Sequence, residues 1–380
     1  MRLRTRQCCK QGFSRDKPPI HPFCRDDGEE TQLNSSCLLL NIPTEIFLLI
    51  AKYLPRHQQS ILSQTCYPLR RLLLDSDGAC NDISRTLLPG KLDEEQRLDF
   101  LFCLARSRPG SWVCDICVKL HRVDLHDVPA RPRPTRCYRS LVSNCSYYRH
   151  GYDMHHRHFQ LMLKYTRLLE MEDNSEIRRL RSKYRKHLNR LMEPFSEPLH
   201  SFRYGMYGQM KGSYCAYPKV VDGRLLIHAT WTYHNDPEDV AHATSMGTLC
   251  LCLHQAMVPN LPWVLCRLTP IARSDDDLLM AQTRCNPSRV LEFTILEAFL
   301  AVGKETRGFC PFCETDFSVQ VSPKIATVRA WHNLGSEVTI SSNDPWKWQT
   351  NRHSRDGVYA QPGSVRRLYC QAGSAQNYAP

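Results

Sequence analysis

The chain has 380 residues, enough for two or three domains, and its hydrophobic (42%) and charged (23%) fractions are those of a globular protein. Its formal net charge of +12 permits contact with nucleic acid, but the basic residues are not confined to one block. The two most apolar runs, 38–54 and 290–302, are interrupted by charged residues. Neither is typical of a membrane span.

The chain contains 19 cysteines. Its start, MRLRTRQCCK, leads into no apolar stretch, so we expect no secretory signal. A protein without such a signal is expected in the reducing cytosol or nucleus, where paired cysteines are more often metal ligands or redox thiols than disulfides. Residues 1–36 are polar, basic and rich in proline, and they predict a disordered tail.

The segment 42–73 predicts three short helices with more apolar surface than they can bury in one another. Pro43 suits the first turn of a helix, and Pro55 ends that helix. Pro68 disfavours helix at Tyr67, so a third helix should begin near Pro68. About 35 residues rarely bury enough surface to be stable alone, so one side of the array should meet a neighbour. The apolar face of the first helix consists of Ile46, Leu49, Ile50, Tyr53 and Leu54.

The residue order here, LLLNIPTEIFLLIAKYL followed by LSQTCYPLRRLL, resembles the F-box. Ile42 stands where that family usually has Leu, and Pro68 is unusual in it. The resemblance implies a three-helix domain over 37–80 that docks on the Skp adaptor of a cullin–RING ubiquitin ligase. The residues alone also allow a helical piece packed on the protein's own second half. By position, the adaptor-facing residues would be Leu40, Ile42, Pro43, Ile46, Ile50 and Leu54.

The rest of the chain predicts a linker helix and a mixed domain. LDEEQRLDFLFCLARSRPG, at 92–110, indicates a helix within a linker over 81–111. Cysteine pairs, histidines and strand-like runs then define a domain over 112–348, and the polar residues 349–380 are expected to form a flexible tail. Helices are expected at 176–192 and 291–302, and strands at 224–234, 317–321 and 326–331.

Short groups of cysteine and histidine predict two zinc sites. Cys-x-x-Cys places two thiolates on one tight turn, where both can bind the same tetrahedral zinc, which then needs two more nitrogen or sulfur ligands. We expect two structural zinc ions with four protein ligands each, hence no open position for metal-centred catalysis. One set is Cys114, Cys117, His121 and Cys137, and the other is Cys252, His254, Cys310 and Cys313.

These assignments have alternatives. CPFC, at 310–313, resembles the redox dithiol of glutaredoxins, but it leads into a strand-like run late in the chain. Plain buried thiols, a merely hydrogen-bonded His121 and an exchange of ligands between the two sets also stay open. The MHHRH group at 154–158 begins an apolar-periodic stretch, and a metal role is the alternative for it. The motifs of zinc nucleobase deaminases are absent from the sequence.

Further segments in the same order are similar to those of many fungal F-box proteins: WVCDICVKLH, DGRLLIHATW, CLCLH and CPFCETDF. This extends the resemblance loosely over 92–348 and implies an architecture but no catalytic residue. Between them, IRRLRSKYRKHLNR at 177–190 carries seven basic residues and no acid. We interpret it as a helix with a solvated basic face, and an import signal or a contact with acidic partners or nucleic acid as the alternatives.

Together these features predict an α+β protein: disordered tail, three-helix F-box, linker helix and a mixed α/β domain held together by zinc. The expected function is the non-catalytic substrate receptor of an SCF-type (Skp–cullin–F-box) ubiquitin ligase. Its partners would be the Skp adaptor, through it a cullin, and an unknown protein substrate, with no membrane contact. The alternative is a zinc-dependent regulatory protein that binds nucleic acid, for which salt-dependent binding would be the sign.

Overall fold

The computed structural model describes ten stretches of the chain: 38–74, 92–135, 137, 146–170, 175–199, 210–234, 243–257, 289–337, 345–350 and 361–371. The predicted tail 1–36 lies outside them. Within them the protein is mixed α/β, built around a six-stranded antiparallel sheet, as the sequence led us to expect at this coarse level. No helix in these stretches combines the length and apolar character needed to cross a membrane.

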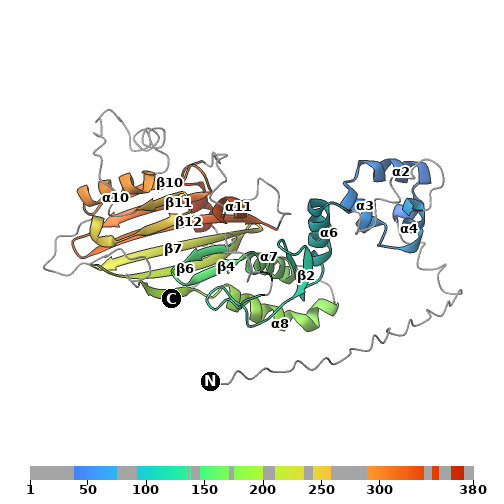
Figure 1. Ribbon diagram of the computed structural model, residues 1–380, viewed down its shortest axis with the longest axis horizontal. Helices are drawn as coiled ribbons and strands as arrows, with labels where there is room; N and C mark the ends of the chain where they lie inside the picture. Colours follow the sequence, from blue (N-terminus) through green and yellow to red (C-terminus); the bar gives the residue numbers. More distant parts are fainter. Residues whose placement is uncertain are drawn as a thin grey trace, which may run out of the picture.

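Three short helices form a separate unit at one end of the molecule: α2 (Thr44–Tyr53), α3 (Arg56–Leu62) and α4 (Tyr67–Leu74) (Figure 1). A 3-10 turn, Leu38–Asn41, precedes them. Pro43 stands directly before α2 and Pro55 follows its C-cap residue, which confirms the expected start and end of the first helix. The third helix begins at Tyr67, although the following proline was expected to disfavour helix at that residue. The unit has a small core of its own, formed by Phe47, Ala51, Leu69 and Leu73.

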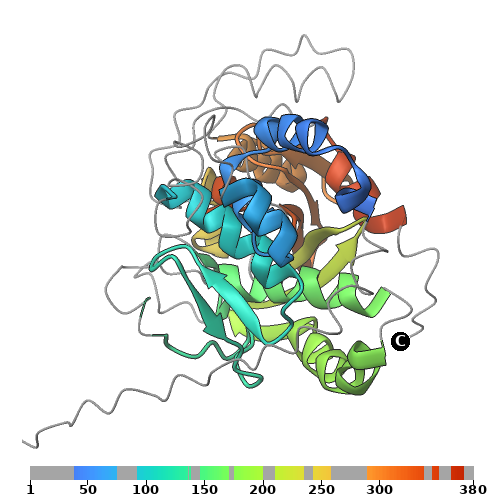
Figure 2. The ribbon, with the colours of Figure 1, turned by 90° about the vertical axis from the view of Figure 1, so that its right-hand side faces the viewer.

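The linker helix α6 (Glu94–Arg106) joins this unit to the sheet, as the sequence predicted. Asp93 caps it by accepting a hydrogen bond from the backbone N–H of Gln96 at 2.8 Å. On the side of the helical unit, His57 Nδ1 lies 3.7 Å from an oxygen of Asp99 in α6. Viewed from that end, the three helices stand in front of the sheet domain (Figure 2).

The sheet has the strand order β10-β11-β12-β7-β6-β5, and every neighbouring pair is antiparallel. Strands β6 and β7 are joined by Asp222 and Gly223, both at positive φ (49° and 69°), which is the backbone of a tight hairpin turn. The predicted strands at 224–234, 317–321 and 326–331 are confirmed. The strands are β5 (Phe195–Leu199), β6 (Lys211–Val221), β7 (Arg224–His234), β10 (Glu305–Phe309), β11 (Thr315–Val321) and β12 (Ile325–Ser336).

Helices cover both faces of the sheet. The main core lies between one face and the helices α7 (His156–Glu170) and α10 (Val290–Leu300). The basic helix α8 (Ser175–Leu191) packs against α7, with Tyr184 and Leu191 of its predicted apolar stripe buried. Three two-stranded hairpins flank the sheet: β1 (Ser111–Cys114) with β2 (Lys119–Arg122), β3 (Ser146–Arg149) with β4 (Tyr152–His155), and β8 (Leu249–Cys252) with β9 (Gln255–Met257).

The sequence prediction of a flexible tail over 349–380 is wrong in part. Helix α11 (Pro345–Thr350) runs past residue 349, and residues 364–371 form α12 (Ser364–Gln371). Val365 of α12 is buried with Leu226 and Trp331 on the outer face of the sheet, and Asp316 accepts hydrogen bonds from the backbone N–H groups at the start of α12. The polar composition misled the prediction, because one turn of apolar contacts is enough to fix a short helix on a sheet.

Candidate metal centres and an exposed helical face

The first predicted ligand set gathers at the β1–β2 hairpin. Cys114 ends β1, Cys117 lies in the turn and His121 lies in β2, while Cys137 approaches from the following chain. The four ligand atoms all lie within 4.8 Å of one another. His121 Nε2 is 3.0 Å from Cys117 Sγ and 3.6 Å from Cys137 Sγ. Because each Zn–S bond is about 2.3 Å, two sulfurs on one tetrahedral zinc are about 3.8 Å apart, so the cluster has nearly the dimensions of a zinc site.

The hairpin turn is strained in a way that suits a ligand cluster. Val118, directly after Cys117, has φ +50°, a region in which a β-branched side chain costs on the order of 1–2 kcal/mol. Trp112 stacks on the ring of His121 with centroids 4.8 Å apart, which fixes the plane of the imidazole. Burial raises the pKa of the Cys114 thiol to about 12, so a metal ion would have to displace its proton on binding.

The second set brings together two turns that are distant in sequence. Cys252 ends β8, His254 lies in the β8–β9 turn, and Cys310 and Cys313 lie in the β10–β11 turn. Their ligand atoms also lie within 4.8 Å of one another. Neither ring nitrogen of His254 has a hydrogen-bond partner among the described residues. A bound metal would satisfy one of them, and would hold the small hairpin against the sheet.

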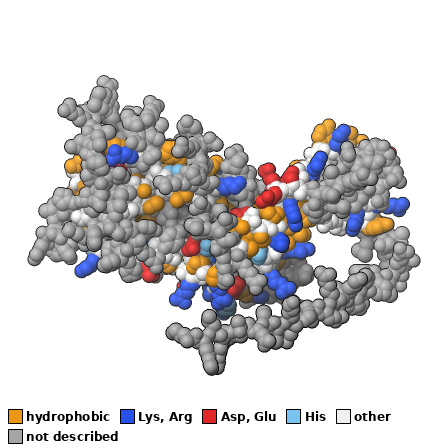
Figure 3. All heavy atoms as spheres, viewed as in Figure 1, with side chains coloured by type: hydrophobic (Ala, Val, Ile, Leu, Met, Phe, Trp, Pro, Cys, Tyr) orange, Lys and Arg blue, Asp and Glu red, His pale blue; other side chains and the backbone are white. Residues whose placement is uncertain are grey.

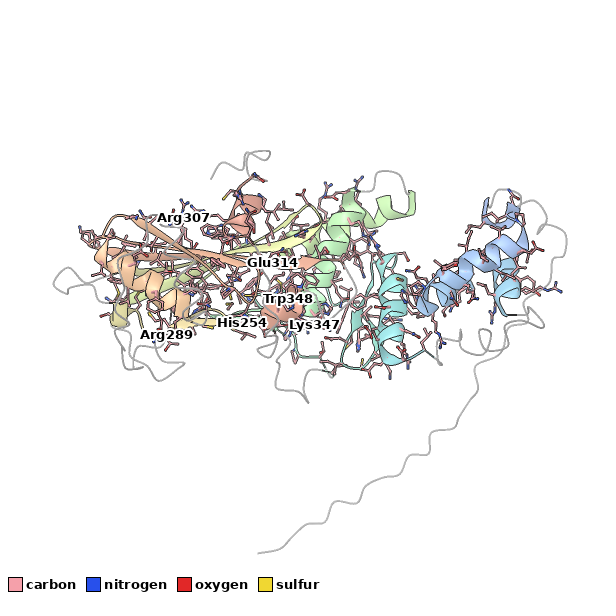
Figure 4. All side chains as sticks on the ribbon, turned by 90° about the horizontal axis from the view of Figure 1, so that it is seen from above. His254, Arg289, Arg307, Glu314, Lys347 and Trp348 are labelled. Carbon is pink, nitrogen blue, oxygen red and sulfur yellow. The ribbon has the colours of Figure 1, made fainter. Side chains whose placement is uncertain are left out.

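Side chains from three elements support the second cluster. Thr315 Oγ1 is 3.3 Å from Cys313 Sγ and 3.1 Å from His332 Nδ1, and it accepts a hydrogen bond from Gln349 of α11 at 2.8 Å. Trp348, also in α11, packs against the three cysteines. Figure 4 shows His254, Trp348 and Glu314 beside one another at this end of the sheet. Metal sites in proteins depend on such surrounding hydrogen bonds to orient their ligands.

Three thiols buried together cannot all ionise. Burial raises the pKa of Cys252 and of Cys313. Burial acts in the same direction on Cys310, but hydrogen bonds from Cys252, from Cys313 and from the backbone N–H of Phe312 outweigh it and lower the pKa of Cys310. Of the three thiols, Cys310 is therefore the one whose thiolate form the surroundings favour. This is a ready first ligand for a soft divalent cation.

The helical unit exposes an apolar face. Four large side chains along α2 remain exposed: Ile46 (51%), Leu49 (57%), Ile50 (45%) and Tyr53 (82%). Leu39 in the preceding turn is exposed too. Figure 3 shows the hydrophobic side chains over α2. The spacing of these residues at i, i+3, i+4 and i+7 puts them on one side of the helix, while Phe47 and Ala51 point to the unit's core.

The predicted adaptor-facing residues do not all lie on this face. Ile46, Ile50 and Pro43 are exposed, whereas Ile42 and Leu54 are half-buried and Ile42 packs on the small core. The side chain of Leu40 lies outside the described residues. Leu49 and Tyr53 are as exposed as the selected residues but were left out of the prediction. The helical stripe in the sequence already contained both of them.

The MHHRH group is part of the core. His155, His156, Arg157 and His158 are all buried at the start of α7. His158 Nε2 lies 3.1 Å from Asp127, which also pairs with the guanidinium of Arg157. These residues therefore lie in a buried charge network, and they are not grouped with either candidate metal cluster.

Comparison with known proteins gives no match to a family model, a curated protein or a solved structure.

Proposed function

We propose that the protein is the substrate-receptor subunit of an SCF-type ubiquitin ligase. The apolar face of α2 supports this proposal most directly. Ile46, Leu49, Ile50 and Tyr53 lie together on a helical unit whose own core is already filled by other residues. Contiguous apolar surface of this kind marks an interaction site on a soluble protein. The sequence resemblance to the F-box names the partner, the Skp adaptor.

In this proposal the chain performs no chemical step. The sheet domain holds a protein substrate, and the adaptor connects it to a cullin and a charged ubiquitin-conjugating enzyme. The rate of ubiquitin transfer rises because the substrate lysine is kept at a high effective concentration near the thioester. The linker helix α6 sets the distance between the two parts, since it touches both the helical unit and β1.

Co-purification with the Skp adaptor tests the proposal. The double variant Ile46→Asp, Ile50→Asp places two charges in the proposed interface, where burial without a partner costs several kcal/mol. We expect the native chain to bind and the variant to lose at least a hundredfold in affinity. The matched control is Leu300→Asp, Val302→Asp, which changes two exposed apolar residues (82% and 57%) near the end of α10. Equal binding by all three chains would sink the proposal.

We further propose that the two cysteine–histidine clusters each hold a structural zinc ion. The donor sets, three thiols and one imidazole in each, fit zinc by chemistry and by spacing. With four protein ligands a site is closed, so zinc here would contribute folding free energy. The first ion would fix the β1–β2 hairpin beside α6 and α7, and the second would join the β8–β9 hairpin to the β10–β11 turn.

Metal analysis of purified protein checks this claim. We expect two zinc ions per chain, and one fewer in Cys117→Ser and in Cys313→Ser. Cys215→Ser is the matched control, because Cys215 lies in neither cluster and its thiol donates a hydrogen bond to Ser196 on β5. This variant should retain two ions. A native content well below two after purification without chelators would contradict the assignment of both sites.

A role in nucleic-acid binding is the rival function. The exposed basic residues of α8, Lys183, Arg185 and Lys186, supply the charge for it. Binding of duplex DNA or RNA that weakens steeply with salt would favour the rival.

A further inference from the structure

A cavity of ≈ 70 Å³ lies between the linker helix α6 and the buried helix α7. Its walls are apolar and come from Phe102 and Ala105 of α6 and Phe159 of α7. The exposed thiol of Cys103 and the side chains of Arg106 and Glu337 also line it. Since one water needs about 10–15 Å³ measured in this way, the space suits about five non-hydrogen atoms. Neither the proposed adaptor face nor the metal clusters use this cavity.

Lys164 supplies a buried positive charge to the cavity. The residue is 2% exposed, and its ammonium donates to the carbonyl oxygen of Ser111 at 2.7 Å and, more weakly, to that of Arg108 at 3.5 Å. An ammonium has three hydrogens, so these bonds leave one for a ligand. Burial lowers the pKa of Lys164 to about 8, and the group therefore remains mostly charged at neutral pH.

His156 supplies a neutral donor. The amide nitrogen of Gln160 donates to the carbonyl of Val113 at 2.8 Å and lies 3.1 Å from His156 Nδ1. Because an amide nitrogen can only donate, Nδ1 is the acceptor and the ring proton is on Nε2. Nε2 is buried and has no hydrogen-bond partner in the described part of the chain. An unsatisfied buried N–H is costly, and His156 is one of the residues that line the cavity.

Among the residues that line the cavity, cations outnumber acids. Glu337 is the acidic residue, and its carboxylate accepts two hydrogen bonds from Arg167 at 2.6 and 3.1 Å and lies 3.9 Å from Arg106. Lys164 and Arg106 are the two cations of the lining. The hydrogen-bond donors and the positive charge favour an anionic acceptor as the ligand. The apolar side chains of the lining favour a small apolar group next to that anion.

We propose that this cavity binds the C-terminal carboxylate of a protein chain whose last residue carries a small apolar side chain. The inference rests on the proposed function and names the substrate class: proteins recognised by their chain end. The carboxylate would lie between Lys164 and His156, and the apolar side chain would contact Phe102 and Phe159. The rest of the substrate would leave past Cys103, where the cavity meets the exposed side of α6. A chain end fits better than a free acid, because the preceding peptide adds contacts that five atoms cannot provide.

Fluorescence polarisation on the full chain tests the proposal with a labelled peptide that ends in Gly-Ser-Gly-Ala, whose terminal Cα, methyl group and carboxylate are five non-hydrogen atoms. We expect the free-acid peptide to bind at least tenfold more tightly than the same peptide as a C-terminal amide. Cys103→Trp fills the cavity from an exposed position and should weaken the free-acid peptide at least tenfold, whereas the matched control Cys103→Ser should not change it. Lys164→Met should remove the preference for the acid over the amide.

Equal binding of acid and amide, or unchanged binding by Cys103→Trp, would overturn the proposal. Propionate, which has five non-hydrogen atoms, is the second probe. If it protects Cys103 from alkylation while the peptide acid does not bind, the cavity takes small free acids and the chain-end assignment is wrong. Adaptor binding by the same variants is measured separately. Peptide binding that survives Ile46→Asp, Ile50→Asp shows that the cavity works even if the adaptor proposal fails.

Discussion

Among single residues, Asp127 carries the densest set of polar contacts near the first cluster. It accepts from the backbone N–H of Arg133 at 2.7 Å and from His158 Nε2 at 3.1 Å, and it pairs with Arg157. Arg157 also donates to the carbonyl of Arg133 at 2.8 Å. The network fixes the start of α7 against the loop that follows β2. Removing one member would leave a buried charge without its partner, which typically costs 3–5 kcal/mol.

The pH dependence of stability should reveal the buried histidines. Burial lowers the pKa of both His156 and His158 to about 4, below the ordinary 6.5. Between these values the unfolded chain binds more protons than the folded chain. The free energy of unfolding should therefore be highest above pH 6.5 and should fall as the pH drops towards 4, by at most about 3 kcal/mol for each histidine. Urea titrations at several pH values measure this free energy.

Zinc release at low pH would act in the same direction, so a metal-sensitive dye has to be read in the same titrations. His228, whose pKa burial also lowers to about 4, contributes in the same way. His158→Gln removes one of these three groups and should make the dependence between pH 6.5 and 4 shallower. An unchanged slope in this variant, at unchanged zinc content, would contradict the assignment.

At the scale of elements, α10 packs closely on the β10–β11 pair. Gly308 of β10 stands opposite Phe317 of β11. A Cβ on Gly308 would overlap the ring of Phe317 and come within 3.0 Å of Thr294 Oγ1 in α10. The three elements therefore meet at a position where only hydrogen fits.

Gly308→Ala should accordingly lower the free energy of unfolding by about 1–3 kcal/mol through overpacking. Gly110→Ala is the matched control, since a Cβ there meets nothing within 4 Å. Chemical denaturation of the two variants gives the comparison. Equal stability of both would mean that the Phe317 ring can move away at little cost.

For the whole molecule, the helical unit and the sheet domain differ in the size of their hydrophobic cores. The core of the unit is formed by four apolar residues, while the sheet domain has an extended core between the sheet and its helices and two smaller buried clusters besides. A fragment of residues 38–74 should therefore show little helix by circular dichroism, whereas 92–371 should unfold cooperatively. A cooperative thermal transition of the short fragment alone would show that its exposed face is not needed for stability.

The sequence alone determined the features that depend on neighbouring residues. Proline positions and the 3.6-residue period predicted α2, α3 and α6, and alternation predicted β11 and β12. Both sets of four candidate ligands were also predicted, because tight Cys-x-x-Cys turns and nearby histidines have recognisable spacing, and the structure places each set together. Whether zinc and the adaptor bind stays a prediction.

Tertiary structure alone decided what depends on contacts between distant segments. It brought His254 to Cys313 across more than fifty residues and set the order of the six strands. It packed α12 on Trp331 although the tail is polar in composition, and it brought Lys164 and His156 into the lining of one cavity. No local pattern carries this information, because periodicity reports which face of an element is apolar but not which other element will cover it.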